Sequence, residues 1–137
     1  MYSVDPFFTG RLGIPYGQWI ARLHSKRSHT RNLVLIQGLS KEVAATFNLP
    51  IDFLFIDGDH SYDAVKSDWT IWYPKIVEGG IIALHDSRPS ANSPTALGTM
   101  QFYVEDIRTC PGVIELDAVD SLSVLQVTTV ASNPLPD

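Results

Sequence analysis

Two clusters of acidic and histidine residues each follow an apolar run in this 137-residue chain. The run from Ile51 to Ile56 ends in Asp57-Gly58-Asp59-His60, and the run from Ile81 to Leu84 ends in His85-Asp86. A carboxylate beside an imidazole can move a proton, orient a hydroxyl group or bind a cation. These residues are therefore the first candidates for an active site.

The elements around the two clusters predict that they meet. Apart from Asp52, residues 51–56, which run up to Asp57, have the composition of an inner parallel strand that is buried on both faces. A helix follows, with Ser61 as its N-cap, and its predicted core stripe is Val65, Trp69, Trp72, Tyr73 and Ile76. Ligands of open α/β sheets bind outside the carboxyl ends of the strands, where both clusters lie.

The residues before this region alternate between strand and helix patterns. Residues 1–4 predict a strand that ends at Asp5-Pro6, because proline cannot donate to a ladder. A helical pattern over 18–23 places Trp19, Ile20 and Leu23 on one face, and residues 33–36 form a second short apolar run. Ser40 is a candidate N-cap for a helix over 41–47.

The last third of the chain has a different pattern. Pro74 ends or bends the preceding helix, and Glu78-Gly79-Gly80 predicts a turn into the next strand. A helix is predicted over 96–108, followed by β-rich runs at 113–116 and 121–127. The sequence therefore predicts an α/β fold, a doubly wound and mostly parallel sheet that closes with an antiparallel hairpin.

Composition excludes several classes of function. The net charge of −5 argues against nucleic-acid binding, and no apolar run approaches the 18 residues of a membrane span. A single cysteine, Cys110, provides neither a disulfide framework nor a cysteine metal cluster, so a cytoplasmic location is expected. The length predicts one domain over residues 1–130, with 131–137 as a flexible tail.

The segment Phe55-Ile56-Asp57-Gly58-Asp59-His60-Ser61-Tyr62 resembles a signature of class I S-adenosylmethionine-dependent methyltransferases. Within that superfamily it is similar to the small-molecule O-methyltransferases whose fourth strand carries this motif. The same group has a tryptophan-bearing helix, a proline, Gly-Gly and a strand ending in His-Asp. Trp72, Pro74, Gly79-Gly80 and His85-Asp86 follow that order here, and the resemblance extends over about residues 2–127.

The resemblance implies S-adenosylmethionine as the cofactor and assigns residues to it. Asp5 stands where the family has an acidic residue that binds the ribose hydroxyls, and a carboxylate can accept from both hydroxyls. Gly38-Leu39-Ser40 resembles the segment beside the adenine, and Asp57 is the further cofactor candidate. Asp5 as a turn residue and Ser40 as an N-cap are the alternatives that need no cofactor.

The resemblance also implies a metal set. Related metal-dependent enzymes hold a divalent ion with an aspartate and a following acidic or amide pair, which here are Asp57 and His85-Asp86. Such an ion would orient the acceptor hydroxyl for attack on the methyl group. Mg²⁺ prefers oxygen ligands, so His85 indicates either a softer metal or a histidine that acts directly as a base.

Asp57 and His60 are the candidate catalytic residues. His60 stands where catechol-type enzymes of the superfamily carry a basic side chain, and imidazole is a suitable general base near neutral pH. The alternative is structural, with His60 capping the next helix or binding Asp86.

The family has a first strand and a G-x-G-x-G loop before the residues that match this sequence. Three explanations for the lack of a matching first strand and loop in this sequence stay open. The chain is a fragment of a longer enzyme, it is a truncated natural copy without activity, or other strand pairing closes the gap. Unpaired strand edges predict a homo-oligomer.

The predicted function is methylation of an oxygen on a small-molecule acceptor. The alternatives are a non-catalytic domain that binds or oligomerises, and a metal-dependent hydrolase that uses the Asp and His residues.

Overall fold

The computed structural model describes residues 1–8, 16–27, 32–90 and 97–129. The predicted tail at 131–137 lies outside these ranges, and the expected single domain over 1–130 stays a prediction. Internal contacts divide the chain into two compact units, Met1–Phe47 and Asn48–Asp137, which are described separately. None of the described helices has the length and apolar content that crossing a bilayer requires.

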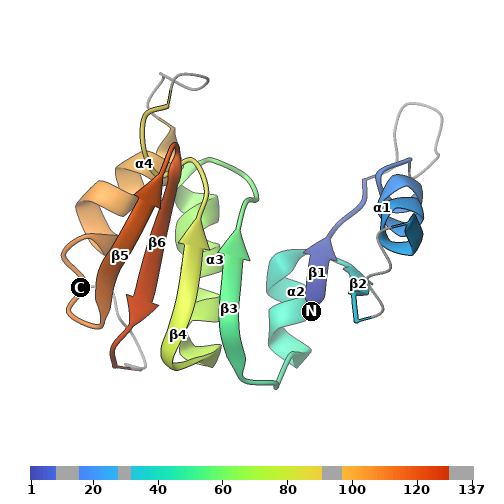
Figure 1. Cartoon of the computed structure of the whole chain (residues 1–137), viewed down its shortest axis with the longest axis horizontal. Coiled ribbons are helices and arrows are strands. Elements are labelled where there is room, and N and C mark those ends of the chain that lie inside the picture. The colour runs from blue at the N-terminus through green and yellow to red at the C-terminus, as the bar shows by residue number, and fades with distance from the viewer. Residues whose placement is uncertain (9–15, 28–31, 91–96, 130–137) are drawn as a thin grey trace. The chain divides into compact units, whose positions relative to one another are not determined.

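The described residues of the first unit form two parallel strands and two helices. Strands β1 (Tyr2–Asp5) and β2 (Val34–Gln37) pair in register from Tyr2 opposite Val34 to Asp5 opposite Gln37. Helix α1 (Tyr16–Arg27) connects them, and α2 (Ser40–Thr46) follows β2 (Figure 1). The edge of the Phe47 ring meets Tyr2 at a centroid distance of 5.3 Å, which packs the end of α2 against β1.

The second unit is a four-stranded sheet with the order β3-β4-β6-β5. Its strands are β3 (Ile51–Ile56), β4 (Ile76–Leu84), β5 (Val113–Val119) and β6 (Leu122–Val127). Strands β3 and β4 are parallel, whereas β6 runs antiparallel to both β4 and β5. This topology confirms the predicted α/β class and the antiparallel hairpin at its end.

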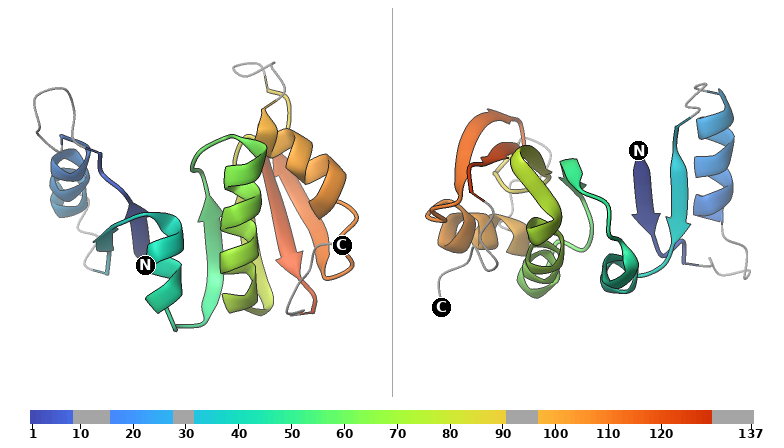
Figure 2. Two further views of the ribbon diagram at one scale, coloured as in Figure 1. Left: turned by 180° about the vertical axis from the view of Figure 1, so that it is seen from behind. Right: turned by 90° about the horizontal axis from the view of Figure 1, so that it is seen from below.

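Helices cover one face of this sheet. Figure 2 shows α3 (Tyr62–Trp72) and α4 (Gly98–Phe102) lying against it, and α4 continues into a π-helical turn at Tyr103–Ile107. The predicted stripe is buried throughout: Val65, Trp69, Trp72, Tyr73 and Ile76. Ile76 belongs to β4, however, because a 3₁₀ turn at Tyr73–Lys75 that contains Pro74 ends the helix.

The buried hydroxyl of Tyr73 finds partners across this core. It donates toward the carbonyl oxygens of Gly112 and Thr129, at 3.1 and 3.0 Å. Burial is the main reason that the pKa of Tyr73 rises to about 12, and Cys110 adds to the rise. The hydroxyl thus stays protonated and joins the helix layer to the end of the hairpin.

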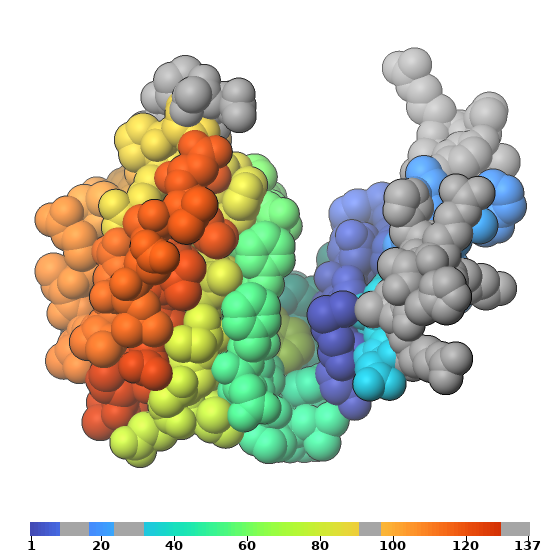
Figure 3. Space-filling model, viewed as in Figure 1, coloured from blue at the N-terminus to red at the C-terminus, as the bar shows by residue number. Residues whose placement is uncertain are grey.

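Strand β3 differs from the sequence prediction in its burial. Ile56 is buried, but Phe53 and Phe55 are 62% and 51% exposed. Within its sheet β3 is the edge strand, and none of the described helices lies over the face of the sheet that Figure 3 shows. A continuous apolar run does not distinguish an inner strand from an edge strand with one open face. Self-association through such edges stays a prediction.

Three local predictions are also corrected. Gly79-Gly80 lie inside β4 rather than before it, and Gly79 adopts a φ of 81° that suits glycine. Leu39, not Ser40, occupies the N-cap position of α2, which begins at Ser40 itself. Trp19, Ile20 and Leu23 share a helix as expected, but all three are exposed on α1.

Truncating a buried ring should destabilise the second unit far more than truncating an exposed one. Phe102 is fully buried and packs edge-on against Tyr62 and Trp69. We expect Phe102→Ala to lower the free energy of unfolding by about 3–5 kcal/mol, measured by denaturant titration with circular dichroism. Phe53→Ala is the matched control and should cost less than about 1 kcal/mol. Equal losses of unfolding free energy in the two variants would show that the exposed face of β3 is covered.

Candidate active site

The polar clusters that follow β3 and β4 come together in the second unit. The ladder between the two strands continues one residue past the end of β4, where the His85 N–H donates to the carbonyl of Ile56, the last residue of β3, at 3.0 Å. This bond places Asp57, which follows β3, next to His85, which follows β4. The predicted meeting of these residues is therefore confirmed by their positions.

Two carboxylates and two imidazoles form the cluster. His85 Nδ1 lies 3.1 Å from Asp57 Oδ1 and 3.5 Å from Asp86 Oδ2. His60 Nδ1 lies 3.6 Å from the same Asp86 oxygen, so Asp86 stands between the two rings. Its side chain is 15% exposed, whereas those of Asp57, His60 and His85 are 39–42% exposed. A ligand can therefore reach three of the four side chains.

The Nδ1 atom of His85 is unusual within this cluster. It is buried and lies at ion-pair distance from Asp57, yet it makes no aligned hydrogen bond among the described residues. Asp86 adopts a φ of 51°, a left-handed conformation that aspartate tolerates better than most residues. Strained backbone of this kind is frequent at functional sites.

Two hydrogen bonds hold the loop that carries His60. Asp59 Oδ1 accepts from the Ser61 backbone N–H at 2.8 Å, and this bond is the first reason that the pKa of Asp59 falls below its usual value. The His60 carbonyl accepts from the Thr99 N–H at 3.1 Å. Ser61 is the N-cap of α3, as predicted, although its side chain makes no capping bond. The backbone thus holds His60 at the start of the helix.

The turn between β5 and β6 adds a residue that the sequence analysis did not select. Ser121 Oγ lies 3.4 Å from His85 Nε2, and the Ser121 carbonyl accepts from the Ser87 N–H at 3.0 Å. Only the antiparallel pairing of β6 with β4 brings this turn to the site, and no spacing within the sequence signals it.

A buried network anchors the segment that follows Asp86. Ser87 Oγ donates to Ser123 Oγ at 2.7 Å, and Arg88 Nε donates to the same atom at 3.0 Å. Arg88 also pairs with the Glu115 carboxylate and donates to Tyr103 at 3.1 Å. These contacts tie the segment to both strands of the hairpin and to the π-helical turn.

The predicted metal set is not supported by this geometry. Among the described residues, no group of three or more His, Cys, Asp and Glu side chains is arranged to hold a metal ion. Asp57, His85 and Asp86 are neighbours, but the imidazole nitrogen faces the two carboxylates directly. The cluster is therefore a set of His–Asp pairs.

The first unit contains the residues predicted to bind the cofactor. Asp5 lies at the carboxyl end of β1, where its Oδ1 accepts from the Phe7 N–H at 2.6 Å, and its carbonyl accepts from Gly38 N–H at 3.2 Å. Asp5 is thus the turn residue of the alternative interpretation, and its ribose role stays a prediction. Gly38 and Leu39 lead directly into α2, which starts at Ser40.

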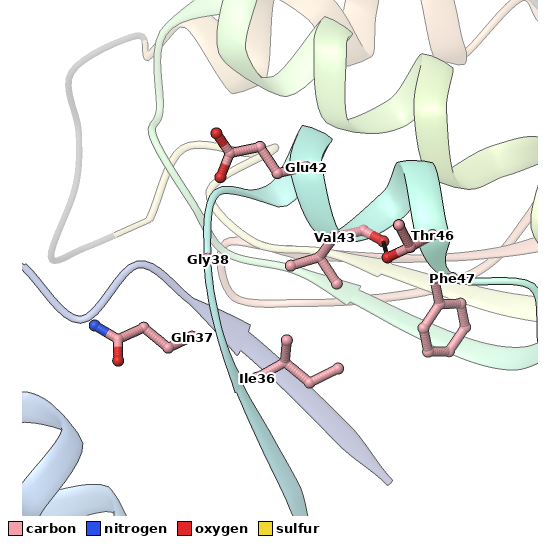
Figure 4. A pocket seen from close by; sticks show the side chains of 7 residues that line it. All are labelled: Ile36, Gln37, Gly38, Glu42, Val43, Thr46 and Phe47. Atoms are coloured by element: carbon pink, nitrogen blue, oxygen red, sulfur yellow. Dashed lines mark hydrogen bonds between the residues drawn. The ribbon is translucent and has the colours of Figure 1, made fainter.

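A shallow, open pocket of about 350 Å³ lies beside this segment (Figure 4). Its walls are formed by Ile36, Gln37, Gly38, Glu42, Val43, Thr46 and Phe47. A Cβ atom at position 38 would lie 3.0 Å from Val43 Cγ2, so glycine allows the chain to pass close to α2. The lining is mixed, with apolar side chains at Ile36, Val43 and Phe47 and polar ones at Gln37, Glu42 and Thr46.

Comparisons with known proteins agree with this architecture. A family model described as a methyltransferase domain matches residues 1–87, more than half of the chain. A candidate caffeoyl-CoA O-methyltransferase of Staphylococcus aureus superposes with a TM-score of 0.66 at 16% identity, over 93% of this chain and 64% of that one. A Bacillus cereus O-methyltransferase in complex with SAH superposes with a TM-score of 0.62 at 19% identity, over 93% of this chain and 62% of that one.

A sequence relative comes from a virus. An uncharacterised protein of Acanthamoeba polyphaga mimivirus is 38% identical over 58 residues, which are 42% of this chain and 26% of that protein. The chain spans about three fifths of the length of the two solved structures above. At these identities the solved structures support the fold.

Filling the space at Gly98 should displace the His60 loop. A Cβ atom there would lie 2.8 Å from the His60 carbonyl oxygen and closer still to the Tyr62 nitrogen. We expect Gly98→Ala to destabilise the protein by about 1–3 kcal/mol in denaturant titrations and to shift the Tyr62 amide resonance. Gly17→Ala, also near a helix start but with its nearest contact at 3.8 Å, should do neither. An unshifted Tyr62 resonance would contradict this packing.

Proposed function

The chain belongs to the methyltransferase-domain family, and we propose that it takes part in methyl transfer from S-adenosylmethionine to an oxygen of a small molecule. The observation that carries this proposal is the cluster of two carboxylates and two imidazoles at the ends of β3 and β4. Transfer to a hydroxyl group requires a group that removes its proton, and partly exposed imidazoles and carboxylates can do so.

His60 is the proposed general base. The Asp86 carboxylate beside Nδ1 favours the tautomer that carries its proton there, which leaves Nε2 as the basic nitrogen. Asp57 would accept a hydrogen bond from the acceptor hydroxyl and hold its oxygen in place for attack. His85 and Asp86 then act behind these two residues, holding the carboxylate and the imidazole in position.

Asp5 and the Gly38-Leu39-Ser40 segment are the proposed contacts of the adenosine part of the cofactor. Asp5 uses Oδ1 for its own turn, so Oδ2 would accept from the ribose hydroxyls. The pocket beside Gly38 has apolar walls at Ile36, Val43 and Phe47, which suit a flat ring such as adenine. When bound, the cofactor would supply an electrophilic methyl group on a sulfonium.

A second candidate is a domain that binds a ligand without turnover. Binding of S-adenosylhomocysteine without methyl transfer by the same sample would favour it. The metal-dependent hydrolase is not proposed, because the described Asp and His residues do not form a metal centre.

Asp5→Asn should weaken the cofactor while keeping the turn. The amide oxygen still accepts from the Phe7 N–H, but the charge and the second acceptor are lost. We expect the Kd of S-adenosylhomocysteine to rise about 10- to 100-fold in calorimetric titrations, the equivalent of about 1.4–2.8 kcal/mol. Asp52→Asn makes the same change of charge on β3 and should leave the Kd unchanged. Equal affinities for the Asp5 variant and the parent chain would place the ribose elsewhere.

Asp57→Asn should lower the rate of methyl transfer with little effect on folding. The side chain is 42% exposed, so its pair with His85 contributes little to stability. We expect the rate of S-adenosylhomocysteine formation to fall at least about 100-fold, measured with a panel of phenolic and sugar hydroxyl acceptors. Asp52→Asn again serves as the control. Undiminished turnover would remove Asp57 from the mechanism.

A further inference from the structure

The β5–β6 turn contacts the segment after β4 at two points. The Ser121 carbonyl accepts from the Ser87 N–H at 3.0 Å, and the Ser87 hydroxyl oxygen lies 3.2 Å from the same carbonyl oxygen. Two residues earlier on that segment, His85 Nε2 lies 3.4 Å from Ser121 Oγ. The turn therefore holds the segment by its backbone and meets the imidazole with its side chain.

The backbone on both sides of this contact has little freedom. Asp86 and Asp120 adopt φ values of 51° and 54°, and each directly precedes one of the two serines. Ser121 is 6% exposed and Ser87 is 1% exposed. Left-handed residues persist where the surrounding structure determines them fully, so Ser121 Oγ is held at a defined place relative to the ring.

The opposite nitrogen of the His85 ring faces negative charge. Nδ1 lies 3.1 Å from Asp57 Oδ1 and 3.5 Å from Asp86 Oδ2, and it is buried. An unprotonated Nδ1 would turn its lone pair toward two carboxylates, which is repulsive. A protonated Nδ1 turns a positive N–H toward them, which is attractive in this partly desolvated setting.

We propose that Ser121 is a positioning residue that fixes the tautomer of His85. Its hydroxyl donates to Nε2, so that the ring proton stays on Nδ1 between Asp57 and Asp86. Which ring nitrogen of a histidine carries the proton is commonly set by the hydrogen bond at the other one. The Phe55 ring makes an edge contact with the imidazole at a centroid distance of 6.2 Å.

This assignment deepens the proposed function and rests on it for its catalytic consequence. With Nε2 accepting from Ser121 and a protonated Nδ1 attracted to the two carboxylates beside it, His85 holds Asp57 and Asp86 in place rather than accepting a proton. The free basic nitrogen is then on His60, whose Nδ1 lies 3.6 Å from Asp86. The two histidines have different tasks although both contact the same carboxylate.

The test is the tautomer of His85 in the full chain without cofactor. Two-bond ¹H–¹⁵N correlation spectra of histidine-labelled protein separate protonated from unprotonated ring nitrogens, and His85→Gln assigns the signals. At a pH above the imidazole titration we expect a protonated Nδ1 and an unprotonated Nε2. In Ser121→Ala the two ¹⁵N shifts should move toward each other, as for a mixture of tautomers, and Ser121→Thr should restore their separation.

Ser123→Ala is the matched control for this experiment. Ser123 is a buried serine of the same hairpin that contacts Ser87 and Arg88, so its loss tests general loosening of the hairpin. The His85 shifts should not change in this variant. If Ser121→Ala does not fold, Ser121→Cys keeps the volume with a weak donor and should show the same convergence.

Two results would overturn the proposal. One is a His85 ring protonated on Nε2 in the parent chain, and the other is a folded Ser121→Ala protein with unchanged His85 shifts. Neither depends on S-adenosylhomocysteine binding or on turnover. Failure of this proposal can therefore be distinguished from failure of the proposed methyl transfer.

Discussion

The hydrogen bond from the His85 N–H to the Ile56 carbonyl is the contact on which the candidate active site depends. It extends the parallel pairing of β3 and β4 one residue beyond the end of β4. Because strand side chains alternate between faces, a shift of one residue in this register would turn Asp57 and His85 away from each other. The backbone ladder, rather than the attraction between side chains, brings the polar groups together.

The charges themselves are too exposed to hold such a cluster. Side chains of Asp57, His60 and His85 are 39–42% exposed, and pairs of that kind contribute about 0–1 kcal/mol. Hydrogen bonds of uncharged neighbouring groups place the charged side chains instead. The Thr99 N–H binds the His60 carbonyl, and the buried contacts of Ser87 and Ser123 hold the segment after Asp86. A rigid frame around exposed charges leaves them free to interact with a ligand.

The sequence predicts those parts of the structure that depend on local pattern. Apolar runs identify the strands, and the meeting of Asp57 with His85 follows because parallel strands end at the same edge. The exposure of Phe53 and Phe55 is not readable from that pattern, since neighbours in the sheet decide it. Ser121 was missed for a similar reason: it lies 36 residues from His85 and resembles an ordinary turn serine.

The position of β6 between β4 and β5 has a consequence for the order of folding. Ile81 pairs with Gln126 and Leu84 with Ser123, so the central pairing joins residues that are synthesised far apart in time. On the ribosome, β3, α3 and β4 emerge first and must wait with one side of β4 unpaired. The environment of His85 is complete only after β6, the last of the described strands, has inserted, so the candidate site cannot form before the chain has been synthesised through β6.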